Sequence, residues 1–221
     1  MIGILGGTFD PVHFGHLRPA LEIRQALGLD EIRLLPARMP PHREQPVASP
    51  EQRLAMLQAA IIGHDDFVID TRELERPGPS YMIDTLQSLR DEFSSRTLCL
   101  LLGVDAYAGL ASWRRWRELH DYCHMVVMMR PGTEVPQTGV TGEFTRRHRA
   151  AKPGMLRQQS SGLVCLQTVS QLEISATAIR ALIARGEDAS FLLPDRVLGY
   201  IHEHNLYTTR QEHEQGERTT G

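Results

Sequence analysis

The feature that most constrains the fold of this chain is a short apolar run that ends in two glycines and leads directly into a helical pattern. Residues 1–5 are apolar, Gly6 and Gly7 follow them, and His13 and His16 stand where helical spacing of apolar residues begins. A strand that ends in glycines before a helix brings bare backbone N–H groups to one point, and helix N-termini attract anions. The arrangement therefore predicts a phosphate site.

Strand-like and helix-like segments alternate along the rest of the chain. Further β-rich runs occupy residues 31–35, 67–70, 97–103, 124–129 and 163–168. Helical patterns occupy residues 17–27, 50–62, 80–93, 175–184 and 194–204, and the sequence at 49–52 predicts a capping box with proline at the first helical position of the second pattern. This alternation is typical of a parallel sheet wound with helices. We expect a single-domain α/β fold, a doubly wound, Rossmann-like parallel sheet with helices on both faces.

Length, composition and charge are those of one globular domain. The chain has 221 residues, of which 41% are hydrophobic, and its 24 basic and 27 acidic residues give a net charge of −3. This near balance offers no field for capturing nucleic acid, so none is expected as a partner. We expect a domain over residues 1–207, with a surface insertion at 131–161 where periodicity is weak. Residues 208–221 are polar and are expected to form a disordered tail.

Cysteine usage and hydropathy bear on the compartment. Cys99, Cys123 and Cys165 are odd in number and far apart, which favours free thiols in a reducing environment. No run approaches the roughly 20 apolar residues of a membrane span, and no basic stretch precedes an apolar segment at the N-terminus. We therefore expect a cytoplasmic protein without a membrane partner. The sequence leaves the oligomeric state open between a monomer and a homodimer.

Several kinds of site are compatible with glycines and histidines in this order. A dinucleotide site fits poorly, because the glycine spacing differs from G-x-G-x-x-G and no acidic residue closes the second strand. A zinc site would need a third close ligand, and only Asp10 is near, so no protein-bound metal is expected. Capping or surface histidines are the plainest alternative. Phosphate binding fits best, since an imidazole beside a phosphate can be protonated near pH 7 and donate to it.

Two motifs resemble those of one family. Residues 6–16, GGTFDPVHFGH, resemble the GGTFDPVHxGH motif of bacterial nicotinate-nucleotide adenylyltransferases, members of the nucleotidyltransferase superfamily that shares HxGH. Residues 174–180, ISATAIR, resemble the family's ISxTxIR motif near its C-terminus. The resemblance covers residue 1 to about residue 207. It implies transfer of AMP from ATP to nicotinate mononucleotide in NAD biosynthesis, giving deamido-NAD and pyrophosphate.

The resemblance assigns the ATP side of the site. His13 and His16 would be the catalytic residues, with His16 meeting the reacting α-phosphate most directly. The segment PPHR at residues 40–43 resembles a family segment that brings a cation over the phosphates, although many members carry Lys where this chain has Arg. The residues that would bind ATP and its phosphates are Gly6, Gly7, Thr8, Phe9, His42, Arg43, Gly103, Asp105, Ile174, Ser175, Thr177 and Arg180.

The metal on this side of the site is the one that accompanies ATP. Mg²⁺ would neutralise the pyrophosphate leaving group. Whether Asp105 binds ribose hydroxyls or helps to place Mg²⁺ stays open. The distal motif also has a meaning of its own, because Ser175 is a good N-cap and Thr177 and Arg180 lie one helical turn apart. Hydroxyls and a guanidinium then face one point, as an anion clamp requires.

The resemblance also assigns the second substrate. Nicotinate mononucleotide would be held by Ser80, Tyr81, Thr85, Trp113 and Arg130. Trp113 would stack on the nicotinate ring, and Thr85 would offer a hydroxyl or N–H near its carboxylate. The alternative for stacking is Trp116, which stands three residues further on and could equally be a core tryptophan.

Three other functions stay open from the sequence. The first is a related transferase that uses pantetheine phosphate, whose members tend to be shorter and to lack the segments around Ser80 and Trp113. The second is an adenylyltransferase for nicotinamide mononucleotide, which differs from nicotinate mononucleotide only by an amide. The third is a non-catalytic nucleotide-binding regulator, against which the two histidines and Arg180 argue.

Overall fold

The computed structural model describes residues 1–39 and 45–208, so the predictions made for His42, Arg43 and residues 209–221 lie outside the described residues. The strands are β1 (Ile2–Gly7), β2 (Glu31–Pro36), β3 (Phe67–Ile69), β4 (Leu98–Gly103), β5 (His124–Met129) and β6 (Val164–Thr168). The helices are α1 (Phe14–Leu27), α2 (Pro50–Ala60), α3 (Arg72–Glu75), α4 (Met82–Glu92), α5 (Val104–Ala108), α6 (Leu119–Tyr122), α7 (Gly139–His148), α8 (Ala176–Ala184) and α9 (Asp195–Glu203). Three short 3₁₀ helices are η1 (Leu110–Ser112), η2 (Trp116–Glu118) and η3 (Pro153–Arg157).

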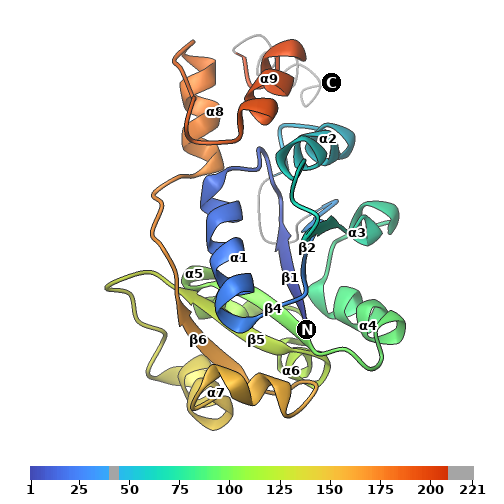
Figure 1. The fold of residues 1–221 in the computed structure, drawn as a ribbon, viewed down its shortest axis with the longest axis vertical. Coiled ribbons are helices and arrows are strands. Elements are labelled where there is room, and N and C mark those ends of the chain that lie inside the picture. Colours follow the sequence, from blue (N-terminus) through green and yellow to red (C-terminus); the bar gives the residue numbers. More distant parts are fainter. Residues whose placement is uncertain (40–44, 209–221) are drawn as a thin grey trace.

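The six strands form one parallel sheet in the order β3-β2-β1-β4-β5-β6. Two hydrophobic cores cover its two faces. One joins the sheet to α1, α2, α8 and α9, and the other joins it to α4, α5 and α6. Helices α8 and α9 lie together at one end of the molecule, beside α2 (Figure 1). The predicted doubly wound α/β fold is confirmed.

The strand order places a binding crevice at one edge of the sheet. The chain moves outward from β1 to β2 and β3, then returns to β4 on the other side of β1 and continues to β5 and β6. In open parallel sheets, ligands bind at the carboxyl ends of the strands where the order reverses. The reversal lies between β1 and β4, whose last residues are Gly7 and Gly103.

Local signals in the sequence agree with the structure. Ser49 caps α2, and its hydroxyl accepts from the Gln52 N–H while the Gln52 side chain accepts from the Ser49 N–H, so the predicted capping box is present. Gly28 ends α1 in the left-handed conformation with φ 61°. The three cysteines are free and buried. No helix in the described ranges is long and apolar enough to span a membrane.

Residues 131–161, expected as a surface insertion, contain helix α7, which the sequence did not predict. Thr141 and Thr145 of α7 are buried, and the Thr145 hydroxyl lies 2.7 Å from that of Tyr107 on α5. Leu156 in η3 is fully buried as well. The segment therefore packs against the domain at several points. Apolar periodicity does not reveal this packing, because the buried residues of α7 are threonine and glycine.

Candidate active site

The turn between β1 and α1 is built around a buried phenylalanine. Phe9 is 1% exposed and has a left-handed φ of 52°. A Cβ on Gly7 would lie 3.0 Å from the Phe9 ring, so only glycine allows this close approach. Gly6 is exposed and Gly7 partly so. Because neither glycine has a side chain of its own, the backbone at the end of β1 stays partly accessible, as a phosphate site requires.

His13 and His16 lie face to face at the start of α1. His13 is the N-cap residue, and its carbonyl accepts from the His16 N–H at 2.9 Å. The two rings stack with centroids 3.8 Å apart, and the Phe9 ring meets His16 edge-on at 5.1 Å. The structure thus brings the predicted catalytic pair to one point at the crevice.

His13 is buried, with a consequence for its charge. Its side chain is 4% exposed, and burial lowers its pKa to about 4. Its Nδ1 atom is also buried and has no hydrogen-bond partner among the described residues. A buried polar nitrogen without a partner is costly, and a ligand oxygen would satisfy it. His13 is therefore neutral near pH 7 and keeps one ring nitrogen available.

The distal motif packs directly against the first motif. Ser175 caps α8 by accepting from the Ala178 N–H at 3.1 Å, as predicted. A Cβ on Gly15 would lie 3.0 Å from the Ile174 carbonyl oxygen and 2.9 Å from the His13 ring. Glycine in HxGH is therefore what allows the segment before α8 to approach the histidines. The two motifs, far apart in sequence, are in contact.

Arg180 is held over this junction by the first motif. Its guanidinium donates to the Asp10 carbonyl at 2.7 Å and to the Thr177 hydroxyl at 3.4 Å. It also lies 3.8 Å from the Asp10 carboxylate. Ser175 and Thr177 are exposed, and Arg180 is partly exposed. These side chains can meet a ligand, and the anion clamp expected from the sequence stays a prediction whose members lie on the same helix beside the first motif.

Asp10 is a structural anchor, a role that the sequence did not indicate. It is 4% exposed and accepts from the N–H groups of Val47 and Ala48 and from the Tyr207 hydroxyl, at 2.8, 3.1 and 2.7 Å. The part of the chain that the structure describes contains no cluster of three or more His, Cys, Asp or Glu that could hold a metal ion. Through its hydrogen bonds, the Asp10 carboxylate joins the β1–α1 turn to the segment at Val47 and Ala48 and to Tyr207.

Arg53 on α2 supports the same turn, a role that the sequence did not indicate. Its side chain is fully buried on α2 and donates to the carbonyls of Thr8, Ala37 and Ala48 at 2.8, 2.7 and 3.3 Å. It thus fastens the ends of β1 and β2 to α2. The signal available in the sequence was its position one turn before Met56 and Leu57, on the apolar side of the helix.

The ends of β4 and β5 supply the next part of the crevice edge. A Cβ on Gly103 would meet nothing within 4 Å, which leaves open space at the end of β4. Asp105 and Arg130 are both exposed and follow β4 and β5 directly. Since these strands are parallel neighbours, both side chains start from the same edge of the sheet as Gly7.

The segment predicted to hold the pyridine nucleotide forms the start of α4. The Ser80 hydroxyl accepts from the Arg38 N–H at 3.0 Å, which ties this segment to the chain after β2. The Arg114 guanidinium lies 4.6 Å from the centre of the Tyr81 ring. Thr85 is fully buried and donates to Glu73 at 2.7 Å. Ser80 and Tyr81 are partly exposed, whereas Thr85 is not.

The two tryptophans are distinguished by burial. Trp116 is 7% exposed and packs edge-on against Phe144, with ring centroids 5.3 Å apart. Trp113 is only partly buried and follows η1. Trp116 is therefore the core tryptophan, and Trp113 retains surface that a ring could stack on.

Comparison with known proteins identifies the family of this chain. Residues 4–182 match the model of the cytidylyltransferase-like family. The chain is 47% identical over 208 residues to a probable nicotinate-nucleotide adenylyltransferase of Methylococcus capsulatus, covering 94% of this chain and 99% of the relative. A probable nicotinate-nucleotide adenylyltransferase of Aeromonas hydrophila is 50% identical over 206 residues, covering 93% and 96%.

Solved structures agree on the fold. Plasmodium falciparum nicotinic acid mononucleotide adenylyltransferase complexed with NaAD superimposes with a TM-score of 0.70 at 18% identity, covering 93% of this chain and 96% of that one. The same enzyme complexed with APC gives a TM-score of 0.68. The family match and the two bacterial relatives, which align along almost their whole length, decide the assignment. The chain belongs to the cytidylyltransferase-like family of nucleotidyltransferases and, within it, to the nicotinate-nucleotide adenylyltransferases.

Proposed function

We propose that this chain transfers AMP from Mg²⁺-bound ATP to nicotinate mononucleotide at the crevice between β1 and β4. A 5′-phosphate oxygen of nicotinate mononucleotide attacks the α-phosphorus of ATP, and the bond from that phosphorus to the bridging oxygen of the leaving group breaks. The products are deamido-NAD and pyrophosphate. The observation that supports this most is the contact of Gly15 with Ile174, which joins the two phosphate-binding motifs at one point.

The attacking phosphate is already an anion, so the reaction needs no general base. Catalysis then consists of positioning the two phosphates and stabilising charge on the phosphoryl oxygens. In the proposal, the N–H groups at Gly7 and Thr8 and the ring of His16 bind the α-phosphate. His13, which is neutral near pH 7, donates through one ring nitrogen. Ser175, Thr177 and Arg180 bind the outer phosphates, with Arg180 already held by Asp10.

The nicotinate nucleotide is proposed to occupy the side of the crevice formed by α4 and η1. Tyr81 and Trp113 are partly exposed there, and aromatic faces stack well on a pyridine ring. Asp105 and Arg130, exposed at the ends of β4 and β5, are proposed to contact sugar or phosphate groups. Relatives at 45–50% identity are named as probable nicotinate-nucleotide adenylyltransferases, which supports this choice of acceptor.

Pyrophosphate release by the purified protein with Mg-ATP tests the proposal. Nicotinate mononucleotide, nicotinamide mononucleotide and pantetheine phosphate are compared as acceptors at equal concentrations. We expect turnover to be fastest with nicotinate mononucleotide. Preference for either of the other two acceptors would reassign the substrate, and ATP binding without release with any acceptor would identify a regulator instead.

Buried free thiols support a proposed cytoplasmic location, which fractionation of cells tests.

A further inference from the structure

A buried carboxyl group lies behind the segment proposed to hold the pyridine nucleotide. Glu73 belongs to the four-residue helix α3 and is 3% exposed. Its carboxylate accepts from the Thr85 hydroxyl at 2.7 Å, and Thr85 itself is fully buried. Burial raises the pKa of Glu73, while hydrogen bonds from Thr85 and Ser80 oppose that rise. Burying this carboxyl group therefore costs the folded state free energy.

Contacts within the protein engage both hydrogen-bond donors of Thr85, its hydroxyl and its backbone N–H. A hydroxyl has one hydrogen to donate, and that of Thr85 goes to Glu73. The Thr85 N–H donates to the Tyr81 carbonyl at 3.3 Å, and its Oγ1 accepts from Arg76 at 3.3 Å. A direct bond from Thr85 to a ligand would require it to give up one of these. In this arrangement Thr85 therefore acts through its neighbours.

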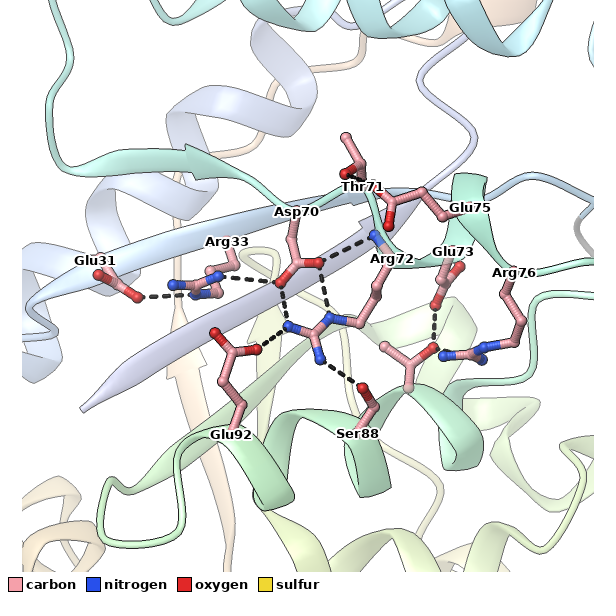
Figure 2. A network of polar contacts seen from close by, with 11 residues as sticks. Glu31, Arg33, Asp70, Thr71, Arg72, Glu73, Glu75, Arg76, Ser88 and Glu92 are labelled. Carbon is pink, nitrogen blue, oxygen red and sulfur yellow. Dashed lines mark hydrogen bonds and ion pairs between the residues drawn. The ribbon is translucent and has the colours of Figure 1, made fainter.

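Glu73 connects the two ends of the segment from Ser80 to Thr85. Its carboxylate accepts from the Thr85 hydroxyl, Ser80 helps to lower its pKa, and the Ser80 hydroxyl in turn accepts from the Arg38 N–H after β2. Figure 2 shows Glu73 and Arg76 reaching from α3 towards the first turns of α4. Tyr81, the N-cap residue of α4, lies between the two fastened hydroxyls.

The other end of α4 is fastened separately. Arg72 donates to Ser88 at 2.8 Å and to Glu92 at 2.7 Å, and it also binds Asp70 after β3 (Figure 2). Since these contacts already attach α4 to the sheet, Glu73 is not needed to hold the helix as a whole. Burying a carboxyl is also costly, and an apolar side chain of similar size would avoid that cost. What Glu73 adds is a fixed geometry for the first turn.

We propose that Glu73 is a positioning residue for the pyridine half of the site, fixing Ser80, Tyr81 and Thr85 in the arrangement that binds the acceptor nucleotide. The inference rests on the proposed function, because it takes the start of α4 as the acceptor subsite. It predicts that losing the carboxyl weakens acceptor binding selectively. ATP, bound at the other motifs, is unaffected.

Steady-state kinetics on four variants test the inference. Glu73→Leu and Thr85→Val are expected to raise KM for nicotinate mononucleotide by about tenfold, the effect of one lost hydrogen bond, and to change KM for ATP by less than about twofold. Glu73→Gln keeps an oxygen that accepts from the Thr85 hydroxyl and is expected to restore most of the affinity. Glu92→Leu removes the acceptor for Arg72 at the far end of α4 and is expected to leave both KM values unchanged.

Equal rises in both KM values, or no rise in Glu73→Leu, would overturn the inference. If Glu73→Leu fails to fold, Thr85→Val and Glu73→Gln decide the question by the same ratio of KM values. If the wild-type protein prefers nicotinamide mononucleotide, the proposed function fails, but the KM ratio measured with that nucleotide still decides the role of Glu73. A wild-type protein that is inactive with every acceptor overturns both.

Discussion

The rings of His13 and His16 stack 30° from parallel, with their centroids 3.8 Å apart. Two protonated imidazoles at this separation would repel each other, and burial holds the pKa of His13 at about 4. The pair therefore carries at most one positive charge near pH 7. The family resemblance gave His16 the more direct contact with the reacting α-phosphate, and the structure distinguishes a buried neutral His13 from a more accessible His16.

His16→Ala removes the ring proposed to meet the reacting α-phosphate. We expect turnover to fall by about 10²-fold or more, as it does when an enzyme loses a donor to its transition state. Pyrophosphate release from Mg-ATP and nicotinate mononucleotide measures the change. His202→Ala, at an exposed position on α9, is the control and should retain full activity. A folded His16→Ala variant with near-normal turnover would remove His16 from the catalytic role.

The pKa of His13 makes stability depend on pH in a defined direction. The folded state holds the neutral form down to about pH 4, whereas the unfolded chain takes up a proton near pH 6.5. The contribution of neutral His13 to the free energy of unfolding is therefore fully present above pH 6.5. It is lost as the pH falls, and the loss reaches about 3 kcal/mol at pH 4. Urea denaturation of wild type and His13→Gln between pH 7 and pH 4.5 measures it. The variant should lose stability less steeply, and parallel curves would contradict the assignment.

Glu73 should show the opposite dependence. Burial raises its pKa above the ordinary value of 4.5, so the folded state favours the protonated carboxyl. Below pH 4.5, burying Glu73 costs the folded state little stability. The cost grows as the pH rises from the ordinary pKa of 4.5 to the raised pKa of the folded state. Thermal unfolding at pH 4 and pH 8 should therefore show Glu73→Gln gaining stability relative to wild type at the higher pH. A constant difference between the two proteins would mean that Glu73 is not perturbed.

The elements that sequence reasoning located well are those with local signals. The strand at His124–Met129 coincides with its predicted bounds because its apolar run is uninterrupted, and the capping box fixes the start of α2. The HxGH and ISxTxIR segments were both identified from their motifs, and the structure brings them into contact. These features depend on neighbours in sequence or on a family pattern, and both can be read without coordinates.

The parts that escaped prediction depend on contacts between distant segments. Asp10 joins Val47, Ala48 and Tyr207, and nothing in its immediate sequence indicates these partners. Arg53 looks like an ordinary helical arginine until its carbonyl partners are known. Helix α7 carries little apolar periodicity, because its buried positions are threonine and glycine. In each case a polar group is satisfied by a partner that only the tertiary structure supplies.

Arg53 should therefore be a major determinant of stability. Arg53→Met leaves the buried carbonyls of Thr8, Ala37 and Ala48 without their shared donor, and we expect a loss of about 3 kcal/mol or more. Arg53→Lys should recover little, since an ammonium lacks the planar fork that reaches several carbonyls. Arg185→Met is the control, because the ion pair of Arg185 with Glu187 is exposed and screened by solvent, so its loss should change stability little. Denaturant unfolding measures all three, and equal losses for Arg53→Met and Arg185→Met would show that Arg53 has no special role.

Gly15→Ala tests whether the approach of the two motifs controls turnover. Its Cβ would stand 3.0 Å from the Ile174 carbonyl and 2.9 Å from the His13 ring, so the segment before α8 or the histidine must move. A displacement of about 1 Å at reacting groups can cost on the order of 10²-fold in rate, whereas overpacking costs about 1–3 kcal/mol of stability.

We therefore expect a folded Gly15→Ala protein with turnover reduced by about tenfold or more. Gly199→Ala is the matched control, because a Cβ on this α9 residue meets nothing within 4 Å. It should keep full turnover and gain up to about 1 kcal/mol, since alanine favours a helix over glycine. Pyrophosphate release and thermal unfolding of both variants give the comparison. If Gly15→Ala lost stability but retained turnover, contact between the motifs would serve the fold and not the reaction.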